Sequence, residues 1–165
     1  MRYFLSLGSN LGKKRRNLSR ALNSLEEAGI EVVRASSIYR TQPVDFAGQP
    51  WFYNQVVEVE APFAPPELLD IVQRIEKGQG RRRTRRKGPR PIDIDILLAE
   101  NRVIATKRLV IPHPRMAGRN FVLVPLAEIA SHTAHPVLKR KVSELKKKST
   151  DPSAVKKLSR RGTRA

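Results

Sequence analysis

Hydrophobic residues in the first sixty positions follow two different periods, which predict a strand, a helix and two further strands. The apolar run at residues 3–7 is typical of a buried strand. Leucines at positions 18, 22 and 25 repeat at the spacing of one helix face, so a helix is expected over residues 13–28. Strands are then expected over residues 30–41 and over residues 52–60, where polar and apolar side chains alternate.

The following eighty residues continue with a second helix and a fourth strand. Two prolines at positions 65 and 66 are suited to a helix start, and apolar residues at helical spacing carry the helix to about residue 77. Residues 92–98 are an almost continuous apolar run broken by two aspartates, which predicts a strand. A short strand at 108–111 and a third helix at 121–129 are expected after it.

This order of elements predicts an α+β fold. Strand, helix, strand, strand, helix, strand is the ferredoxin-like βαββαβ plan, in which an antiparallel sheet is backed by helices. The elements after residue 100 add a C-terminal strand and helix to that plan, and a basic tail follows them. Residues 42–51 contain prolines, a glycine and large apolar side chains, and loops of this composition often cover a ligand.

Charge is unevenly distributed along the 165 residues. The formal net charge is +18, and residues 139–165 carry half of it. Because that tail has few apolar residues, we expect one domain over residues 1–138 and a basic extension over 139–165, partly disordered beyond about Thr150. Cysteine is absent, which excludes disulfides and thiolate chemistry. The N-terminal apolar run is too short for a signal peptide, so a cytoplasmic protein is expected.

The most informative chemistry lies where a cationic segment meets the strand at 92–98. Asp93 and Asp95 are two positions apart, so a strand places both carboxylates on one face, about 6–7 Å apart. Carboxylates on one face repel each other, and hard oxygen ligands of this kind suit Mg²⁺. The preceding segment, residues 81–90, is rich in arginine and lysine, which indicates a polyphosphate ligand. A solvated acidic face on an edge strand would show the same aspartate spacing.

These residues also carry a resemblance to a known family. Gly88-Pro89-Arg90, followed after two residues by Asp93-Ile94-Asp95-Ile96-Leu97, resembles the signature of the 6-hydroxymethyl-7,8-dihydropterin pyrophosphokinases of folate synthesis. Further segments match the family in the same order: Leu7-Gly8-Ser9-Asn10-Leu11, Ser37-Ile38-Tyr39-Arg40-Thr41-Gln42-Pro43, Phe52-Tyr53-Asn54, Gln73-Arg74-Ile75-Glu76, Arg108-Leu109 and Ile111-Pro112-His113-Pro114-Arg115-Met116.

The resemblance implies an activity. A family member transfers the β,γ-diphosphoryl unit of ATP to the hydroxymethyl group of the pterin and releases AMP, with two Mg²⁺ ions between enzyme and phosphates. Such a transfer depends on alignment and charge neutralisation and needs no strong base. The resemblance also implies the ferredoxin-like fold and a monomer.

Roles for individual residues follow from the resemblance, by position in this sequence. The implied metal ligands are Asp93 and Asp95, and the implied catalytic residues are these two with Arg81, Arg83 and Arg90. ATP contacts are implied for Gln73, Glu76, Arg81, Arg83, Arg90, Ile96, Arg108, His113 and Arg119. Pterin contacts are implied for Thr41, Pro43, Val44, Phe52, Asn54, Asp93 and Phe121.

A small basic RNA-binding module is the alternative hypothesis, because RNA-recognition domains share the βαββαβ plan and are also basic. Such domains expose aromatic and basic residues on their central strands. Here the corresponding strand carries Asp93 and Asp95, which repel phosphate unless a metal ion is bound. The sequence therefore favours the enzyme, and any RNA contact is expected to be weak and to involve the tail.

Overall fold

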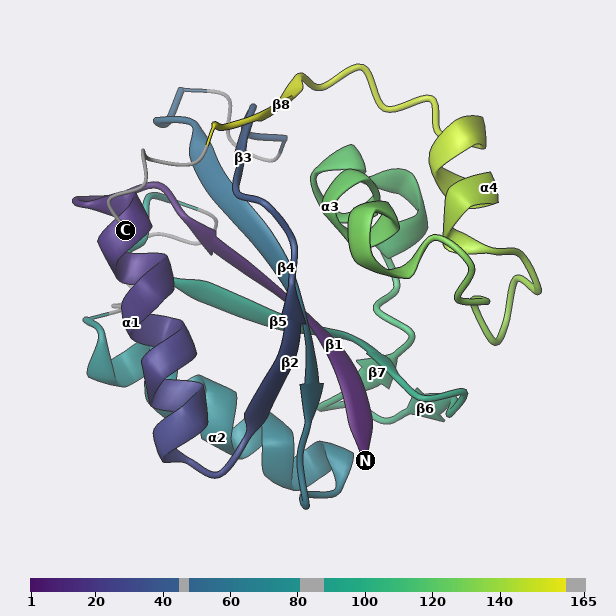
Figure 1. Ribbon diagram of the computed structural model, residues 1–165, viewed down its shortest axis with the longest axis horizontal. Coiled ribbons are helices and arrows are strands. Elements are labelled where there is room, and N and C mark those ends of the chain that lie inside the picture. Colours follow the sequence, from purple (N-terminus) through teal and green to yellow (C-terminus); the bar gives the residue numbers. More distant parts are fainter. Residues whose placement is uncertain (45–47, 81–87, 160–165) are drawn as a thin grey trace.

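The computed structural model describes residues 1–44, 48–80 and 88–159. Over these residues, helices and strands alternate in the first part of the chain, and helices prevail after residue 115 (Figure 1). The elements are β1 (Arg2–Ser9), α1 (Lys14–Glu27), β2 (Glu31–Ala35), β3 (Tyr39–Thr41), β4 (Phe52–Glu60), α2 (Pro65–Gly78), β5 (Asp93–Ala99), β6 (Ile104–Ala105), β7 (Val110–Ile111), a 3₁₀ turn (Met116–Gly118), α3 (Asn120–Ala130), α4 (Val142–Lys148) and β8 (Val155–Lys157).

The main sheet of the described residues has the strand order β5-β1-β4-β3-β8, with β2 also paired to β4. All of these pairings are antiparallel. β6 and β7 form a separate two-stranded sheet. The predicted combination of helices with an antiparallel sheet is therefore confirmed. Among the helices of these residues, none has the length and apolar character needed to cross a membrane.

Helices cover both faces of the sheet (Figure 1). On one face, α1 and α2 bury Leu18 and Leu68 against Leu5 and Leu7 of β1. On the other face, α3 and α4 pack over a second apolar cluster that includes Phe4 of β1. β1 is buried on both faces because its side chains alternate between these two clusters. It is the central support of the sheet.

The prediction of a single strand over residues 30–41 is wrong in one respect, because this stretch forms two strands, β2 and β3. Both segments pair with β4, and the break falls at Ser36–Ile38. Ser36 accounts for the break: its amide donates to the Val56 carbonyl at 2.9 Å and its Oγ accepts the Val56 amide at 3.0 Å. The strand can thus bend while its polar groups stay bonded to β4.

The expectation of disorder beyond about Thr150 is also wrong for the described part of the tail. Residues 155–157 form β8, which adds to the sheet edge beside β3. Before it, α4 buries Val142 and Leu145. Composition underestimated this order because strand addition uses backbone hydrogen bonds, which need no apolar side chains.

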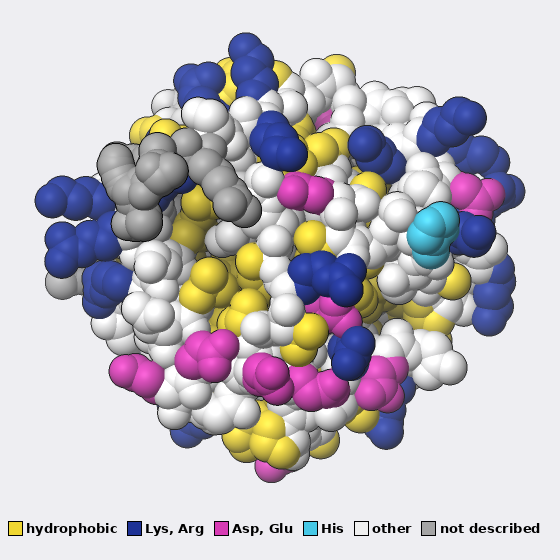
Figure 2. Space-filling view, viewed as in Figure 1, with side chains coloured by type: hydrophobic (Ala, Val, Ile, Leu, Met, Phe, Trp, Pro, Cys, Tyr) yellow, Lys and Arg dark blue, Asp and Glu magenta, His cyan; other side chains and the backbone are white. Residues whose placement is uncertain are grey.

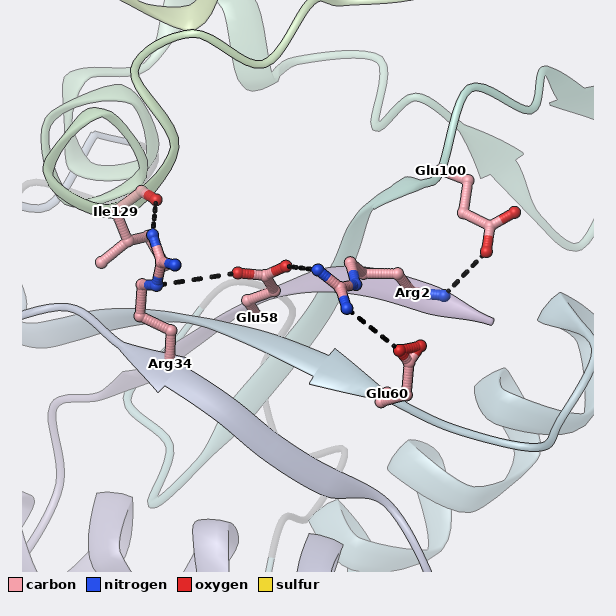
Figure 3. A network of polar contacts seen from close by, with 6 residues as sticks. All are labelled: Arg2, Arg34, Glu58, Glu60, Glu100 and Ile129. Carbon is pink, nitrogen blue, oxygen red and sulfur yellow. Dashed lines mark hydrogen bonds and ion pairs between the residues drawn. The ribbon is translucent and has the colours of Figure 1, made fainter.

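A buried carboxylate on the α3 face of the sheet is compensated by two arginines. Glu58 is 6% exposed. Its carboxylate accepts a hydrogen bond from Arg2 at 2.9 Å and lies 3.9 Å from Nε of Arg34 (Figure 3). Arg34 also donates to the Ile129 carbonyl of α3 at 2.9 Å, and Arg2 reaches Glu60 at 3.3 Å. This network joins α3 to three strands at the end of the sheet opposite to the 41–44 segment.

At the other edge of the sheet, a helix carboxylate completes the hydrogen bonding of β5. β5 pairs only with β1, so its outer edge would leave amides without a strand partner. Glu76 of α2 is buried, and its carboxylate accepts the Ile94 amide at 2.7 Å. This bond ties α2 to the strand segment that carries Asp93 and Asp95.

We expect Glu76→Ala to lower the free energy of unfolding by about 2 kcal/mol, because the buried Ile94 amide loses its acceptor. Glu76→Gln keeps an acceptor oxygen and should cost less than half of that. Urea unfolding of the two variants measures the difference. Equal stability of the Ala and Gln variants would show that the hydrogen bond to Ile94 contributes nothing.

Candidate active site

One pocket opens on the α3 face of the sheet, between β5, β1, β4, the 41–44 segment and the start of α3. Its empty volume is about 510 Å³, part of which is open to solvent. In the view of Figure 2, hydrophobic side chains show near the centre, lysines and arginines lie both at the edges and near the centre, and acidic side chains form a row across the lower half. The residues that line the pocket are Ser6, Gly8, Thr41, Gln42, Pro43, Val44, Gln49, Phe52, Asn54, Arg90, Asp93, Asp95, Arg119 and Phe121.

Asp93 and Asp95 both lie in the pocket wall, as the alternation along β5 predicts. Ile94, between them, is buried on the opposite face. Their partners across the sheet are Gly8 for Asp93 and Ser6 for Asp95. Because these two partners are small, β1 leaves the space in front of the carboxylates open.

Arg90 forms an ion pair with Asp93. Its Nε lies 3.5 Å from Oδ2 of Asp93, and its Nη1 donates to the Gly88 carbonyl at 2.6 Å. The backbone amide of Arg90 donates to Asn10 at 2.9 Å. The guanidinium is therefore held beside the acidic pair by several bonds, with both partners largely shielded from solvent.

The donor set fits Mg²⁺. No group of three His, Cys, Asp or Glu side chains that could hold a metal occurs within residues 1–44, 48–80 and 88–159. Two carboxylates on one face would supply only part of an octahedral shell, and Mg²⁺ prefers to take the remaining ligands from water and phosphate oxygens. An ion held here would therefore keep positions open for a phosphate group.

An amide sits at the bottom of the pocket in a tightly packed position. Asn54 is buried, and its Oδ1 accepts the Thr41 hydroxyl at 2.5 Å. Its Nδ2 donates weakly to the Leu7 carbonyl at 3.4 Å. A methyl group at Gly8 would lie 2.7 Å from this Nδ2, so only glycine permits the observed approach of β1 to the amide.

Two aromatic rings line the pocket, and each has an arginine close to it. The guanidinium of Arg90 lies 5.0 Å from the centre of the Phe52 ring, and that of Arg119 lies 5.5 Å from the centre of the Phe121 ring. These distances are within the range of cation–π contacts. Flat apolar surface and fixed positive charge therefore occur side by side.

His113 lies close to the pocket, just beyond β7. Burial lowers the pKa of His113 below its usual value, and the nearby charges of Arg119 and Arg115 lower it further. The Arg115 amide donates to Nδ1 of the ring at 3.2 Å, which requires a lone pair on that nitrogen. The imidazole is therefore neutral near pH 7, with its proton on Nε2, where it can donate to an anion.

The remaining predicted residues whose placement is described lie outside the pocket lining. Gln73 and Arg108 lie together on the surface, where Arg108 hydrogen-bonds both Asp70 and Gln73. The side chain of Ile96 is buried in the core, so only its backbone is placed to contact a ligand. Glu76 holds the Ile94 amide, as described above. Arg81 and Arg83 lie outside the described residues.

A residue absent from the predicted set joins the two segments that flank the pocket. Asn10 is buried, and its Nδ2 donates to Gln49 at 2.7 Å and to the Pro50 carbonyl at 3.1 Å. Its Oδ1 accepts the Arg90 amide. The turn after β1 thus positions both the 48–51 segment and Arg90. Asn10 belongs to the Leu7–Leu11 motif, which was the available signal, but nothing local in the sequence indicates these distant partners.

Comparison with known proteins connects this pocket to a family. The sequence model of 7,8-dihydro-6-hydroxymethylpterin-pyrophosphokinase (HPPK) matches residues 4–131. The Bacillus subtilis 2-amino-4-hydroxy-6-hydroxymethyldihydropteridine pyrophosphokinase is 46% identical over 127 residues, which cover 76% of this chain and 76% of that protein. The enzyme of the same name from Haemophilus influenzae is 41% identical over 154 residues, which cover 93% and 96%.

Longer proteins contain a similar unit. The Pneumocystis carinii folic acid synthesis protein fol1 is 42% identical over 134 residues, but the chain spans only 18% of its length. Among solved structures, a Plasmodium falciparum HPPK-DHPS with STZ-DHP aligns with a TM-score of 0.72 at 16% identity, covering 89% of this chain and 43% of that one. The structural likeness establishes the fold, and the sequence matches establish the family. The chain belongs to the 7,8-dihydro-6-hydroxymethylpterin-pyrophosphokinase family.

Proposed function

We infer that this chain is an ATP-dependent pyrophosphokinase of folate biosynthesis, which transfers the diphosphoryl group of ATP to the hydroxymethyl group of 6-hydroxymethyl-7,8-dihydropterin. Membership of the pyrophosphokinase family is the observation that supports this function most directly. In the reaction, the pterin hydroxyl oxygen bonds to the β-phosphorus, the bond from that phosphorus to the α-phosphate oxygen breaks, and AMP leaves. The comparisons lend no support to the RNA-binding alternative.

The acidic pair is proposed as the metal site. Asp93 and Asp95 would hold two Mg²⁺ ions on the open side of β5, which is supported by their shared face and by the small residues opposite. Mg²⁺, when bound, neutralises phosphate charge and orients the reacting oxygens. Arg90 would contact the same phosphates, since its guanidinium is already fixed beside Asp93. Arg81 and Arg83 are assigned the same role from the resemblance alone.

The apolar half of the pocket is proposed as the pterin site. A pterin is a flat heterocycle with hydrogen-bonding groups along its edge, so it requires stacking surfaces and an amide partner. Phe52 and Phe121 supply rings, and Asn54 supplies the amide. Thr41 orients that amide by donating to its oxygen, which leaves Nδ2 to donate to the ligand. Pro43 and Val44 would close the pocket edge.

The nucleotide is proposed to extend from the acidic pair along the outer edge of β5. His113 and Arg119 would contact phosphates, which is supported by the neutral Nε2–H of His113 and by the position of Arg119 in the pocket wall. Gln73 and Arg108, which already hydrogen-bond each other, would lie at the base or ribose. Glu76 and the backbone of Ile96 would contribute at the strand edge.

Several broader features stay proposals. The strand order fits a ferredoxin-like classification, with β2 and β3 together in the place of one strand. A boundary at residue 138 between the enzyme domain and the basic extension, a monomeric state, a cytoplasmic location and weak RNA contact through the tail are predictions of the sequence that await measurement.

Asp95→Asn should reduce diphosphoryl transfer by at least about a hundredfold, because one metal-binding charge is lost. The melting temperature should stay the same or rise, since the repulsion between Asp93 and Asp95 is relieved. AMP release from ATP, Mg²⁺ and the pterin measures the activity. Glu31→Gln, an exposed strand carboxylate far from the pocket, is the matched control and should keep full turnover. An active Asp95→Asn variant would refute the metal assignment.

Gly8→Ala should weaken pterin binding by about tenfold, because the added methyl group displaces Asn54. Affinity for a non-hydrolysable ATP analogue should change less, by no more than about threefold, since the atoms nearest to the added methyl group belong to Asn54 and Phe52 and not to Asp93. Calorimetric titration of each ligand separates the two effects. The control is Gly78→Ala, where a methyl group meets no atom within 4 Å. Unchanged pterin affinity in Gly8→Ala would mean that Asn54 does not recognise the ligand.

Lowering the pH from 7 to 5.5 should destabilise the wild type more than His113→Asn. The pKa of His113 is lowered in the folded state. Below about pH 6.5, the unfolded chain therefore binds a proton that the folded chain does not. This lowers the free energy of unfolding by up to about 1.4 kcal/mol per pH unit. Urea unfolding at the two pH values measures this. His135 has a lowered pKa in both proteins, so its effect cancels. Identical pH dependence would contradict a buried neutral His113.

A further inference from the structure

One short segment near the C-terminus, residues 149–159, holds two separate parts of the pocket wall. The first part is the 41–44 segment. β8 extends the sheet beside β3, with Val155 opposite Thr41. The Gln42 amide donates to the Ala154 carbonyl at 3.0 Å, and the Ala154 amide donates to the Gln42 side chain at 3.0 Å. Thr41 and Gln42 are therefore fixed from outside as well as by β4.

The second part is the start of α3, which Asp151 holds. Its Oδ2 accepts the Asn120 amide at 2.8 Å, and its carbonyl accepts the Asn120 side chain at 3.1 Å. The N-cap residue of α3, Arg119, makes no capping hydrogen bond with its own side chain. Asp151 therefore supplies from a distant part of the chain the acceptor that a helix start normally obtains locally. Asn120 lies between Arg119 and Phe121, the two α3 residues that line the pocket.

Asp151 is itself held in a fixed orientation. Its Oδ1 accepts the Ser153 amide at 2.9 Å, and its own amide donates to the Ser149 hydroxyl at 3.2 Å. Burial raises the pKa of Asp151, but the Asn120 and Ser153 hydrogen bonds and the nearby charge of Arg119 outweigh it, so the pKa lies below the usual value. Asp151 and Ser153 also line a hollow together with Pro43, Val44 and Arg119, on the outer side of the pocket wall.

The rest of α3 is attached to the sheet independently of Asp151. Near its C-terminal end, Glu128 accepts hydrogen bonds from the Tyr39 hydroxyl at 2.7 Å and from the Ser37 hydroxyl at 2.8 Å. Arg34 donates to the Ile129 carbonyl. Loss of the Asp151 contacts therefore frees only the first turn of α3, the turn that carries the pocket residues.

We propose that Asp151 is a positioning residue of the pterin site: with β8, it fixes Arg119 and Phe121 of α3 relative to the 41–44 edge, so that the pocket is preformed for the flat ring. This inference rests on the proposed function. The family model matches residues 4–131, and the segment follows that range. Figure 1 shows this segment passing from α4 across the top of the view to β3.

The test compares Asp151→Ala with wild type in the full chain, by calorimetric titration with 6-hydroxymethylpterin and, separately, with a non-hydrolysable ATP analogue and Mg²⁺. Asp151→Ala should weaken pterin binding by about tenfold and analogue binding by only about threefold, because Arg119 is one of several proposed phosphate contacts whereas Phe121 is one of the two proposed stacking rings. Asp151→Asn keeps an acceptor for the Asn120 amide and should restore pterin affinity to within about threefold of wild type. Hydrogen exchange at residues 120–122 should accelerate in the Ala variant and not in the Asn variant.

Glu144→Ala is the matched control, because Glu144 lies in the same extension and its carboxylate accepts the Lys141 amide and pairs with Arg140, both outside the pocket lining. It should leave pterin affinity and exchange at 120–122 unchanged. If Asp151→Ala does not fold, Asp151→Ser replaces it, since a serine hydroxyl is too short to make the Asn120 contact, and the same tenfold loss is expected.

Three results would overturn the inference. Wild-type pterin affinity in the Ala or Ser variant would refute this inference but not the proposed function. An equal loss of pterin and analogue binding would do the same, because it would indicate that the whole site had become less ordered. A wild-type protein that binds no pterin would instead refute the proposed function, and this inference with it.

Discussion

Electrostatic repulsion between Asp93 and Asp95 is the constraint around which the pocket is organised. A strand that places two carboxylates on one face needs compensating positive charge and a backbone that cannot twist the side chains apart. Among the residues that the structure describes, Arg90 supplies positive charge beside Asp93 on the pocket side. Glu76 fixes the backbone from the other side by accepting the Ile94 amide between the two aspartates. In the proposed function, divalent ions bound at the two carboxylates would neutralise them and, with Arg90, would hold a polyphosphate.

The same strand pairing determines how much room the ligands have. β1 presents Gly8 and Ser6 to the pocket, while Leu5 and Leu7 on its opposite face are fully buried beneath α1 and α2. The strand is therefore rigid and still leaves space for ligands on its pocket side. Rigidity comes from the core below, and space comes from the small side chains above. The close approach of Gly8 to Asn54 follows from this arrangement, because a Cβ atom at position 8 would lie 2.7 Å from Nδ2 of Asn54.

Local patterns in the sequence predicted the main helices and strands up to α3, but they missed the break between β2 and β3 and the later α4 and β8. They also predicted the shared face of Asp93 and Asp95, because period-two alternation fixes side-chain direction within one strand. The gathering of Phe52, Asn54 and Phe121 in one pocket was accessible only through the family resemblance. The bonds of Asn10 to Gln49 and Arg90 were accessible by neither route. They join residues 39 and 80 positions apart through single side chains, and such contacts leave no periodic trace in the chain.

The C-terminal extension shows why composition alone misjudges order. With few apolar residues, it cannot form a core of its own, and on that ground it was expected to be partly disordered, beyond about Thr150. It needs no core, because Val142 and Leu145 of α4 are buried against the existing fold and β8 uses backbone groups to extend the sheet that is already there. A strand added in this way can have nearly any polar sequence. The chain can therefore place Asp151 at the start of α3 without the hydrophobic residues that an independent domain would require.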